Sequence, residues 1–140
     1  MRIVLAADGS SYTKKALAFL ITHESLAGPD DEILVVHAQP PLPPRVRSAV
    51  GADVVKSYMN DEAEKVLAPI RRFLDKHDVN YQCEWSVGTA HDQILRAAKK
   101  AKAHMIVMGT HGHGLIGRTL MGSVAQKVIT GADIPVMLVK

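Results

Sequence analysis

Cysteine and aromatic residues are scarce in this 140-residue chain, and long hydrophobic runs are absent. The single cysteine, Cys83, can form neither an internal disulfide nor a thiolate cluster for zinc, which fits a reducing compartment. Apolar runs such as Met105–Met108 and Val136–Val139 are strand-sized, far below the about 20 residues that a membrane helix needs. The apolar stretch after Met1 is also too short for a signal peptide, so we expect a cytoplasmic protein with no membrane partner.

The charge balance and the overall composition exclude further classes. Lys and Arg number 17 and Asp and Glu number 14, which gives a net charge of +3. The basic residues are scattered, and the aromatic residues that could stack on bases are one Trp, three Tyr and two Phe, so nucleic-acid binding is disfavoured. Hydrophobic residues make up 47% of the chain, which is too high for a chain that is disordered throughout. The length of 140 residues predicts a single domain over residues 1–140.

Short apolar runs alternate with amphipathic stretches along the chain. The runs predict strands at Arg2–Ala7, Ile33–Ala38, Met105–Met108 and Val136–Val139, and the alternating segment Val79–Val87 predicts a further strand, half exposed at a sheet edge. Apolar residues at helical spacing predict helices over Ser11–His23, Ala49–His77, Ala90–Lys102 and Thr119–Thr130. Four prolines between residues 40 and 44 predict a loop after the second strand. This alternation is typical of an α/β fold in which helices cover both faces of a parallel sheet, a three-layer sandwich.

The segment after the fourth predicted strand is rich in glycine. Residues 109–123 hold five of the ten glycines of the chain, Gly109, Gly112, Gly114, Gly117 and Gly122. Ligands of parallel sheets bind at the carboxyl ends of the strands, and glycine there lets backbone N–H groups approach a phosphate near the start of the next helix. The loop therefore predicts an anion site, although the same glycines could only shape a tight turn.

Two common phosphate-binding motifs fit this loop incompletely. The spacing Gly112, Gly114, Gly117 matches the dinucleotide fingerprint, but that motif follows the first strand and precedes an acidic residue about twenty positions later. The Walker motif would need lysine where Arg118 stands, and no later acidic residue is placed to hold magnesium. We therefore reject both interpretations.

A third pattern fits completely. Gly109 and Gly112 are followed after nine residues by Gly122 and Ser123, which gives G-x-x-G, nine residues, G-S. With this motif the chain resembles the universal stress protein family, and the resemblance extends over IVLAADGS, LVVHAQP, VGTAHDQILRAAKKAKAHMIVMGTHG and GSVAQKVITGADIPVMLVK. It implies a Rossmann-like fold with a five-stranded parallel sheet in the order 3-2-1-4-5.

The same resemblance implies a nucleotide site. In nucleotide-binding members, the motif's backbone amides and serine hold the phosphates and ribose of ATP, and an Asp at the end of the first strand holds the ribose or base. By position, these residues are Gly109, Gly112, Gly122, Ser123 and Asp8. The resemblance also implies contact of the Ala38 backbone with adenine and a pocket lining of Ala7, Met108 and Val124. We expect ATP as the ligand, and magnesium could enter with it.

Several polar residues near this site have alternative interpretations. Asp8 could instead cap the first helix, and Arg118 could pair with a terminal phosphate or remain a solvated loop cation. His111 and His113 are too few for a metal site without a nearby Cys or carboxylate, so we expect His111 to shape the loop or face a phosphate. His37 is expected to be a core histidine.

Three functions remain open from the sequence. The first is an ATP-binding stress-response or signalling module with slow or no hydrolysis, because no residue is an evident general base or nucleophile. The second is an ATP-consuming phosphotransfer or adenylyl-transfer enzyme, and the third is a nucleotide-free dimeric interaction module. The apolar strand Val136–Val139 precedes only Lys140, and with the resemblance it predicts a homodimer formed through this last strand.

Overall fold

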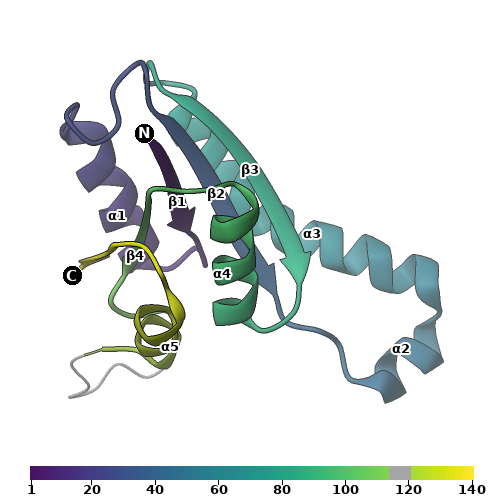
Figure 1. The fold of residues 1–140 in the computed structure, drawn as a ribbon. Coiled ribbons are helices and arrows are strands. Elements are labelled where there is room, and N and C mark those ends of the chain that lie inside the picture. The colour runs from purple at the N-terminus through teal and green to yellow at the C-terminus, as the bar shows by residue number, and fades with distance from the viewer. Residues whose placement is uncertain (114–120) are drawn as a thin grey trace.

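The computed structural model describes residues 1–113 and 121–140, which form five strands and five helices (Figure 1). The strands are β1 (Arg2–Ala6), β2 (Glu32–Gln39), β3 (Asn80–Val87), β4 (Met105–Gly109) and β5 (Val136–Val139). The helices are α1 (Ser11–Thr22), α2 (Pro44–Val50), α3 (Ala52–Leu74), α4 (Ala90–Lys100) and α5 (Ser123–Gly131). The predicted loop residues Gly114, Gly117 and Arg118 lie outside the described residues. No helix within these ranges combines the length and the apolar character that crossing a membrane requires.

The five strands form one sheet in the order β3-β2-β1-β4-β5, and every neighbouring pair is parallel. β1 lies in the middle, where Ile3 pairs with Ile33 of β2 on one side and with Met105 of β4 on the other. This topology confirms the predicted α/β fold and strand order. Because all strands run the same way, their carboxyl ends meet at one edge, and the order reverses there between β1 and β4.

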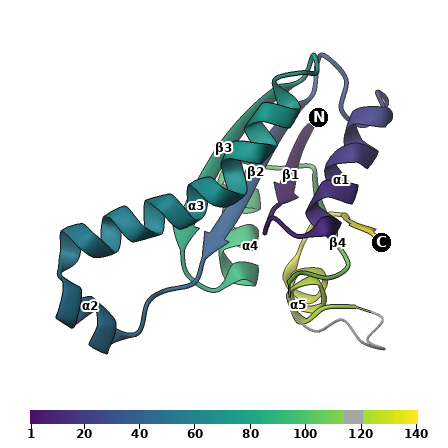
Figure 2. The same ribbon diagram turned by 180° about the vertical axis from the view of Figure 1, so that it is seen from behind.

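Alternate strand residues bury opposite faces of the sheet, as a period of two requires. Ile3 and Leu5 belong to an apolar cluster that includes α1 and α3, whereas Val4 and Ala6 belong to a cluster that includes α4 and α5. Figures 1 and 2 show these helix pairs on the two faces. Fully burying one side chain such as Leu5 stabilises the fold by about 1.5–3 kcal/mol. The two clusters together hold the three layers.

The segment after β2 corrects one expectation. In place of a proline loop and one helix over residues 49–77, the structure has α2, which begins at Pro44, and a separate α3, which ends at Leu74. Proline suits the first position of a helix because the N–H that it lacks would have no intrahelical partner. Gly51, with φ of +86°, separates the two helices, and Pro69 lies inside α3. Figure 2 shows α2 and the start of α3 extending beyond the sheet.

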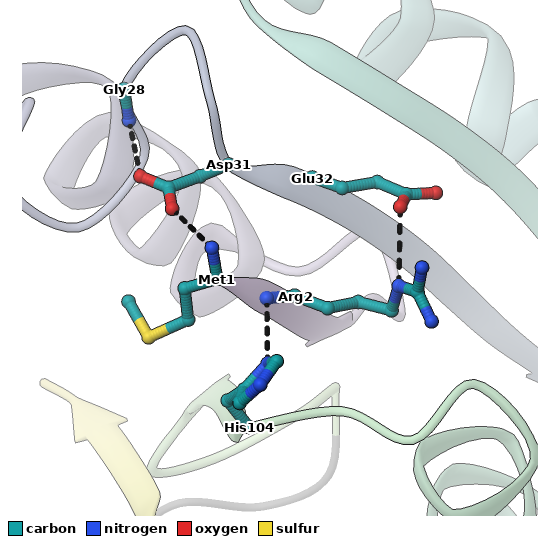
Figure 3. A network of polar contacts seen from close by, with 6 residues as sticks. All are labelled: Met1, Arg2, Gly28, Asp31, Glu32 and His104. Atoms are coloured by element: carbon teal, nitrogen blue, oxygen red, sulfur yellow. Dashed lines mark hydrogen bonds and ion pairs between the residues drawn. The ribbon is translucent and has the colours of Figure 1, made fainter.

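A polar network closes the amino-terminal edge of the sheet (Figure 3). The Met1 amino group lies 2.6 Å from Asp31 Oδ1, and the Gly28 amide donates to Asp31 Oδ2 at 2.9 Å. Arg2 Nε donates to Glu32 at 3.1 Å. The Met1 amino group, followed by the Gly28 amide, holds the pKa of Asp31 below its ordinary value. These bonds connect the starts of β1 and β2, at the edge of the sheet opposite the carboxyl ends of the strands.

Candidate functional site

A cavity of about 430 Å³ lies at the carboxyl ends of β1, β2 and β4, beside the start of α5. Its volume falls in the range of about 300–1,000 Å³ that is typical of small-molecule sites. The structure brings all ten predicted site residues to its lining: Ala7, Asp8, Ala38, Met108, Gly109, His111, Gly112, Gly122, Ser123 and Val124. They come from four separate segments of the chain, so the fold assembles the predicted group in one place.

Asp8 is held at the cavity by the turn between β1 and α1. Its Oδ1 accepts hydrogen bonds from the Ser10 amide at 2.9 Å and from Thr13 Oγ1 at 2.8 Å. The Thr13 hydroxyl also accepts from the Asp8 amide at 3.1 Å, so the two residues bond each other twice. Ser10, and not Asp8, is the N-cap of α1, because its side chain accepts from the Thr13 amide. The bonds to Oδ1 fix the orientation of the carboxylate.

Gly112 lies directly against the second carboxylate oxygen. A Cβ atom built on Gly112 would collide with Asp8 Oδ2, so a larger residue at position 112 would require this carboxylate to turn away. Within the described residues, no donor is bonded to Oδ2. Asp8 Oδ2 is therefore the oxygen of this carboxylate that can accept a hydrogen bond on the Gly112 side of the cavity.

Two other glycines of the motif have steric reasons to be glycine. A Cβ on Gly109 would collide with Tyr12 of α1, and a Cβ on Gly122 would lie 3.1 Å from the Thr110 carbonyl oxygen. The Gly122 amide donates to that same oxygen at 2.7 Å, which joins the two ends of the glycine-rich segment. The Gly122 N–H is thus used inside the loop. Gly109 keeps β4 close to α1, which is the tight-packing role that the sequence left open.

The first turn of α5 opens toward the cavity. Gly122 is its N-cap and offers no side-chain hydrogen bond to the helix, while Ser123, Val124 and Ala125 all line the cavity. The first N–H groups of a helix have no partner inside the helix, and the helix dipole places partial positive charge there. Together with the Ser123 hydroxyl, this turn provides donors suited to an anion.

Ala38 exposes backbone groups at a place where the sheet is incomplete. The Ala7 amide donates to the Val36 carbonyl, so the backbone of Val36 points toward β1, and by alternation so does that of Ala38. The pairing of β1 with β2 extends only to Ala6 and Val36. The Ala38 N–H and C=O therefore face the cavity rather than a strand, next to the apolar side chain of Ile94, which lines the same cavity.

Two imidazole groups of the loop after β4 line the cavity and contact residues at or before the start of α1. His113 Nε2 donates to the Asp8 carbonyl at 2.6 Å, because a carbonyl oxygen can only accept. The centroid of the His111 ring lies 5.1 Å from that of the Tyr12 ring, and His111 Nδ1 lies 2.9 Å from Thr110 Oγ1. Lys15 Nζ lies 5.0 Å from the centroid of the Tyr12 ring. The bond from His113 to Asp8 and the ring contact between His111 and Tyr12 attach the loop after β4 to the segment that begins α1.

Sequence reasoning missed some lining residues. Thr13, Thr110 and His113 were given no role, although all three line the cavity. The five-residue separation of Thr13 from Asp8, across the turn that leads into α1, was a signal that could have identified it. His37 is confirmed as a core histidine: it is 6% exposed, and its two ring nitrogens contact the Ala7 carbonyl and the Gln39 side chain. It lines the cavity as well. Across residues 1–113 and 121–140, no three His, Cys, Asp or Glu side chains gather as metal ligands would.

Comparisons with known proteins agree on one family. The model of the universal stress protein family matches residues 1–140. The chain is 35% identical to a universal stress protein of Thermus aquaticus, over 99% of this chain and 97% of that protein. Its fold matches hypothetical protein MJ0577 of Methanocaldococcus jannaschii with a TM-score of 0.84, at 24% identity over 99% of this chain and 94% of that one.

A third comparison concerns a solved complex. The universal stress protein from Archaeoglobus fulgidus in complex with dAMP matches with a TM-score of 0.71, at 26% identity over 100% of this chain and 98% of that one. The family match spans the whole chain, and the curated relative from Thermus is more than 30% identical over nearly its full length. The chain therefore belongs to the universal stress protein family.

Proposed function

We propose that this protein binds ATP in the cavity at the carboxyl ends of β1, β2 and β4 and acts as a nucleotide-dependent stress-response or signalling module. The observation that carries the proposal is the convergence of Asp8, the Ala38 backbone and the open first turn of α5 on one cavity. A carboxylate acceptor, backbone groups beside apolar side chains and a helix N-terminus are complementary to the ribose, the base and the phosphates of a nucleotide, respectively. The relative from Archaeoglobus fulgidus in complex with dAMP supports an adenine nucleotide as the ligand.

Each part of the nucleotide has a partner in this proposal. Asp8 Oδ2 accepts from a ribose hydroxyl, because ionised carboxylates only accept hydrogen bonds. The Ala38 N–H and C=O bond the edge of adenine, and Met108 and Val124 supply apolar contact with the base. The phosphates lie at the first turn of α5, where Ser123 offers both a hydroxyl and an amide. Magnesium enters only with the nucleotide.

Hydrolysis is slow or absent in this proposal. The Asp8 carboxylate is held by Ser10 and Thr13, in a position that suits sugar binding better than activation of a water at the far end of the phosphates. An ATP-consuming enzyme is the competing function. Appearance of ADP at a rate that depends on the site glycines would favour that competitor.

The direct test asks what the purified protein carries. We expect mass spectrometry of gently purified, then denatured protein to find an adenine nucleotide at about one per chain, and to find a much lower occupancy in Gly112→Ala. Gly131→Ala is the matched control, because it lies at the other end of α5 and its added Cβ would meet only the mobile end of the Leu95 side chain. An empty wild type that also shows no thermal stabilisation by ATP would contradict the proposal.

We also propose that the protein is a cytoplasmic homodimer paired through β5. The Val139 carbonyl accepts from Thr110 at the end of β4, so by alternation the Leu138 backbone points to the open edge of the sheet. An open apolar edge of this kind favours pairing with a second strand. Light scattering should give twice the chain mass at micromolar concentration, and Leu138→Pro, which removes an outward N–H, should give the monomer. A monomeric wild type would refute the dimer.

A further inference from the structure

The segment around α2 makes little contact with the rest of the fold. Residues 43–54 are all exposed, although most of them are helical. α2 has seven residues, no side-chain N-cap and no buried residue, and α3 is the element it packs against most in the described chain. Isolated helices shorter than about 12–15 residues are marginal in water. Any ligand that contacts both α2 and the rest of the fold should therefore stabilise the helical form of this segment.

A groove of about 540 Å³ separates α2 and the start of α3 from the carboxyl end of β3. It is distinct from the nucleotide cavity, with which it shares no lining residue. Its apolar surface includes Trp85 and Val87 of β3 and Val55 and Met59 of α3. The groove is broad and open to solvent rather than enclosed. The complete lining is Pro44, Arg47, Ser48, Ala52, Val55, Lys56, Met59, Trp85 and Val87.

The charges of this groove have one sign. Arg47 and Lys56 line it, and none of its other described lining residues is a carboxylate. Neither cation forms an ion pair with any described residue, whereas further along α3 Lys65 and Arg71 are paired with Glu62 and Glu64. An apolar groove flanked by two unpaired cations and the Ser48 hydroxyl is complementary to a molecule with an apolar body and an anionic head.

We infer that this groove binds an anionic amphiphile, of which a medium-chain carboxylate is the simplest example. The hydrocarbon chain lies on Trp85, Val55 and Met59, and the carboxylate lies between Arg47 and Lys56. The bound molecule bridges α2, α3 and β3 and so fixes the α2 segment. This function is separate from nucleotide binding, although residues 40–44 connect the two sites: Pro40 lines the nucleotide cavity and Pro44 lines the groove.

Trp85 gives the test a direct optical signal, because it is the only tryptophan of the chain and lies half-buried in the groove. Dodecanoate, kept below its critical micelle concentration, is titrated into the full-length protein while tryptophan emission is recorded, and calorimetry gives the stoichiometry. We expect saturable binding of one dodecanoate per chain. Arg47→Gln and Lys56→Gln should each weaken binding about tenfold, since each removes a hydrogen bond to a charged group.

Controls separate this groove from general surfactant binding. Arg45→Gln removes a neighbouring exposed cation of α2 that does not line the groove, and it should leave the affinity unchanged. Dodecyltrimethylammonium has the same tail with a cationic head and should bind at least tenfold more weakly. Gly112→Ala should bind ATP at least about tenfold more weakly and keep its dodecanoate affinity, so failure of one proposal is distinguishable from failure of the other.

Three results would overturn the inference. The first is absence of saturable binding to the wild type. The second is equal affinity for dodecanoate and dodecyltrimethylammonium, or an unchanged affinity in both cation variants, which would make the charges irrelevant. The third is a Trp85 emission that changes with protein concentration alone, in step with association seen by sedimentation, because a second copy of the chain would then fill the groove.

Discussion

Replacing Gly112 with alanine tests the central geometry of the nucleotide site. The added Cβ collides with Asp8 Oδ2, while Oδ1 is held by Ser10 and Thr13. The carboxylate must turn away, and it then no longer presents Oδ2 to a ribose hydroxyl. A hydrogen bond to a charged group contributes about 1.5–3 kcal/mol, so the Kd for ATP should rise at least about tenfold.

The assay compares the free energy of unfolding with and without ATP, which removes any effect of the substitution on the unliganded fold. At an ATP concentration of about 100 times the wild-type Kd, ATP should stabilise the wild type by about 2.7 kcal/mol. The same concentration is then about ten times the Kd of Gly112→Ala, and the stabilisation falls to about 1.4 kcal/mol. Equal stabilisation of wild type and variant would refute the reasoning, because it would mean that the contact between Gly112 and Asp8 has no part in binding.

Three further predictions concern stability. Thr13→Val keeps the shape of a side chain that is 3% exposed but removes the hydroxyl bonded twice to Asp8, so urea denaturation should show a loss of about 1–3 kcal/mol. Leu67→Ala, at a position that is 0% exposed under the sheet, should cost about 2–5 kcal/mol in the same assay, and a smaller loss would mean that α3 repacks. Asp31 has its pKa lowered by the Met1 amino group, so its contribution exists above its ordinary pKa of 3.8 and is lost as the pH falls through the lower folded value. The difference in free energy of unfolding between wild type and Asp31→Asn should therefore be constant from about pH 5 to 7 and shrink below about pH 4; a difference that persists at low pH would contradict this role.

Much of the fold was predictable because its signals are local. Apolar runs such as Met105–Met108 identified strands to within one or two residues, since a strand buried on both faces is apolar at every position. The strand order came from the resemblance. α2 was not predicted because four prolines in five residues favour a loop, and only the structure shows that the last of them, Pro44, begins a helix.

The candidate site was predicted as a set of residues and not as a geometry. The motif named Gly109, Gly112 and Gly122, but each proves to be glycine for a different neighbour: Tyr12, Asp8 and the Thr110 carbonyl. Those neighbours are far away in sequence or on another element, so no spacing rule could reveal them. For the same reason, no local pattern indicated that His113 donates to the Asp8 carbonyl.

The sequence by itself determined the layered α/β architecture, the family and the residues that gather at the carboxyl ends of the strands, because hydrophobic periodicity and a glycine motif are properties of neighbouring residues. Only the tertiary structure decided which groups are free to bind. It uses the Gly122 amide inside the loop, leaves the first turn of α5 without a side-chain cap among the described residues and turns the Ala38 backbone toward a position where β1 has ended. It also brings Arg47 and Lys56, which form no ion pair among the described residues, to the same groove as Trp85, because α2 and the start of α3 extend beyond the sheet near the end of β3.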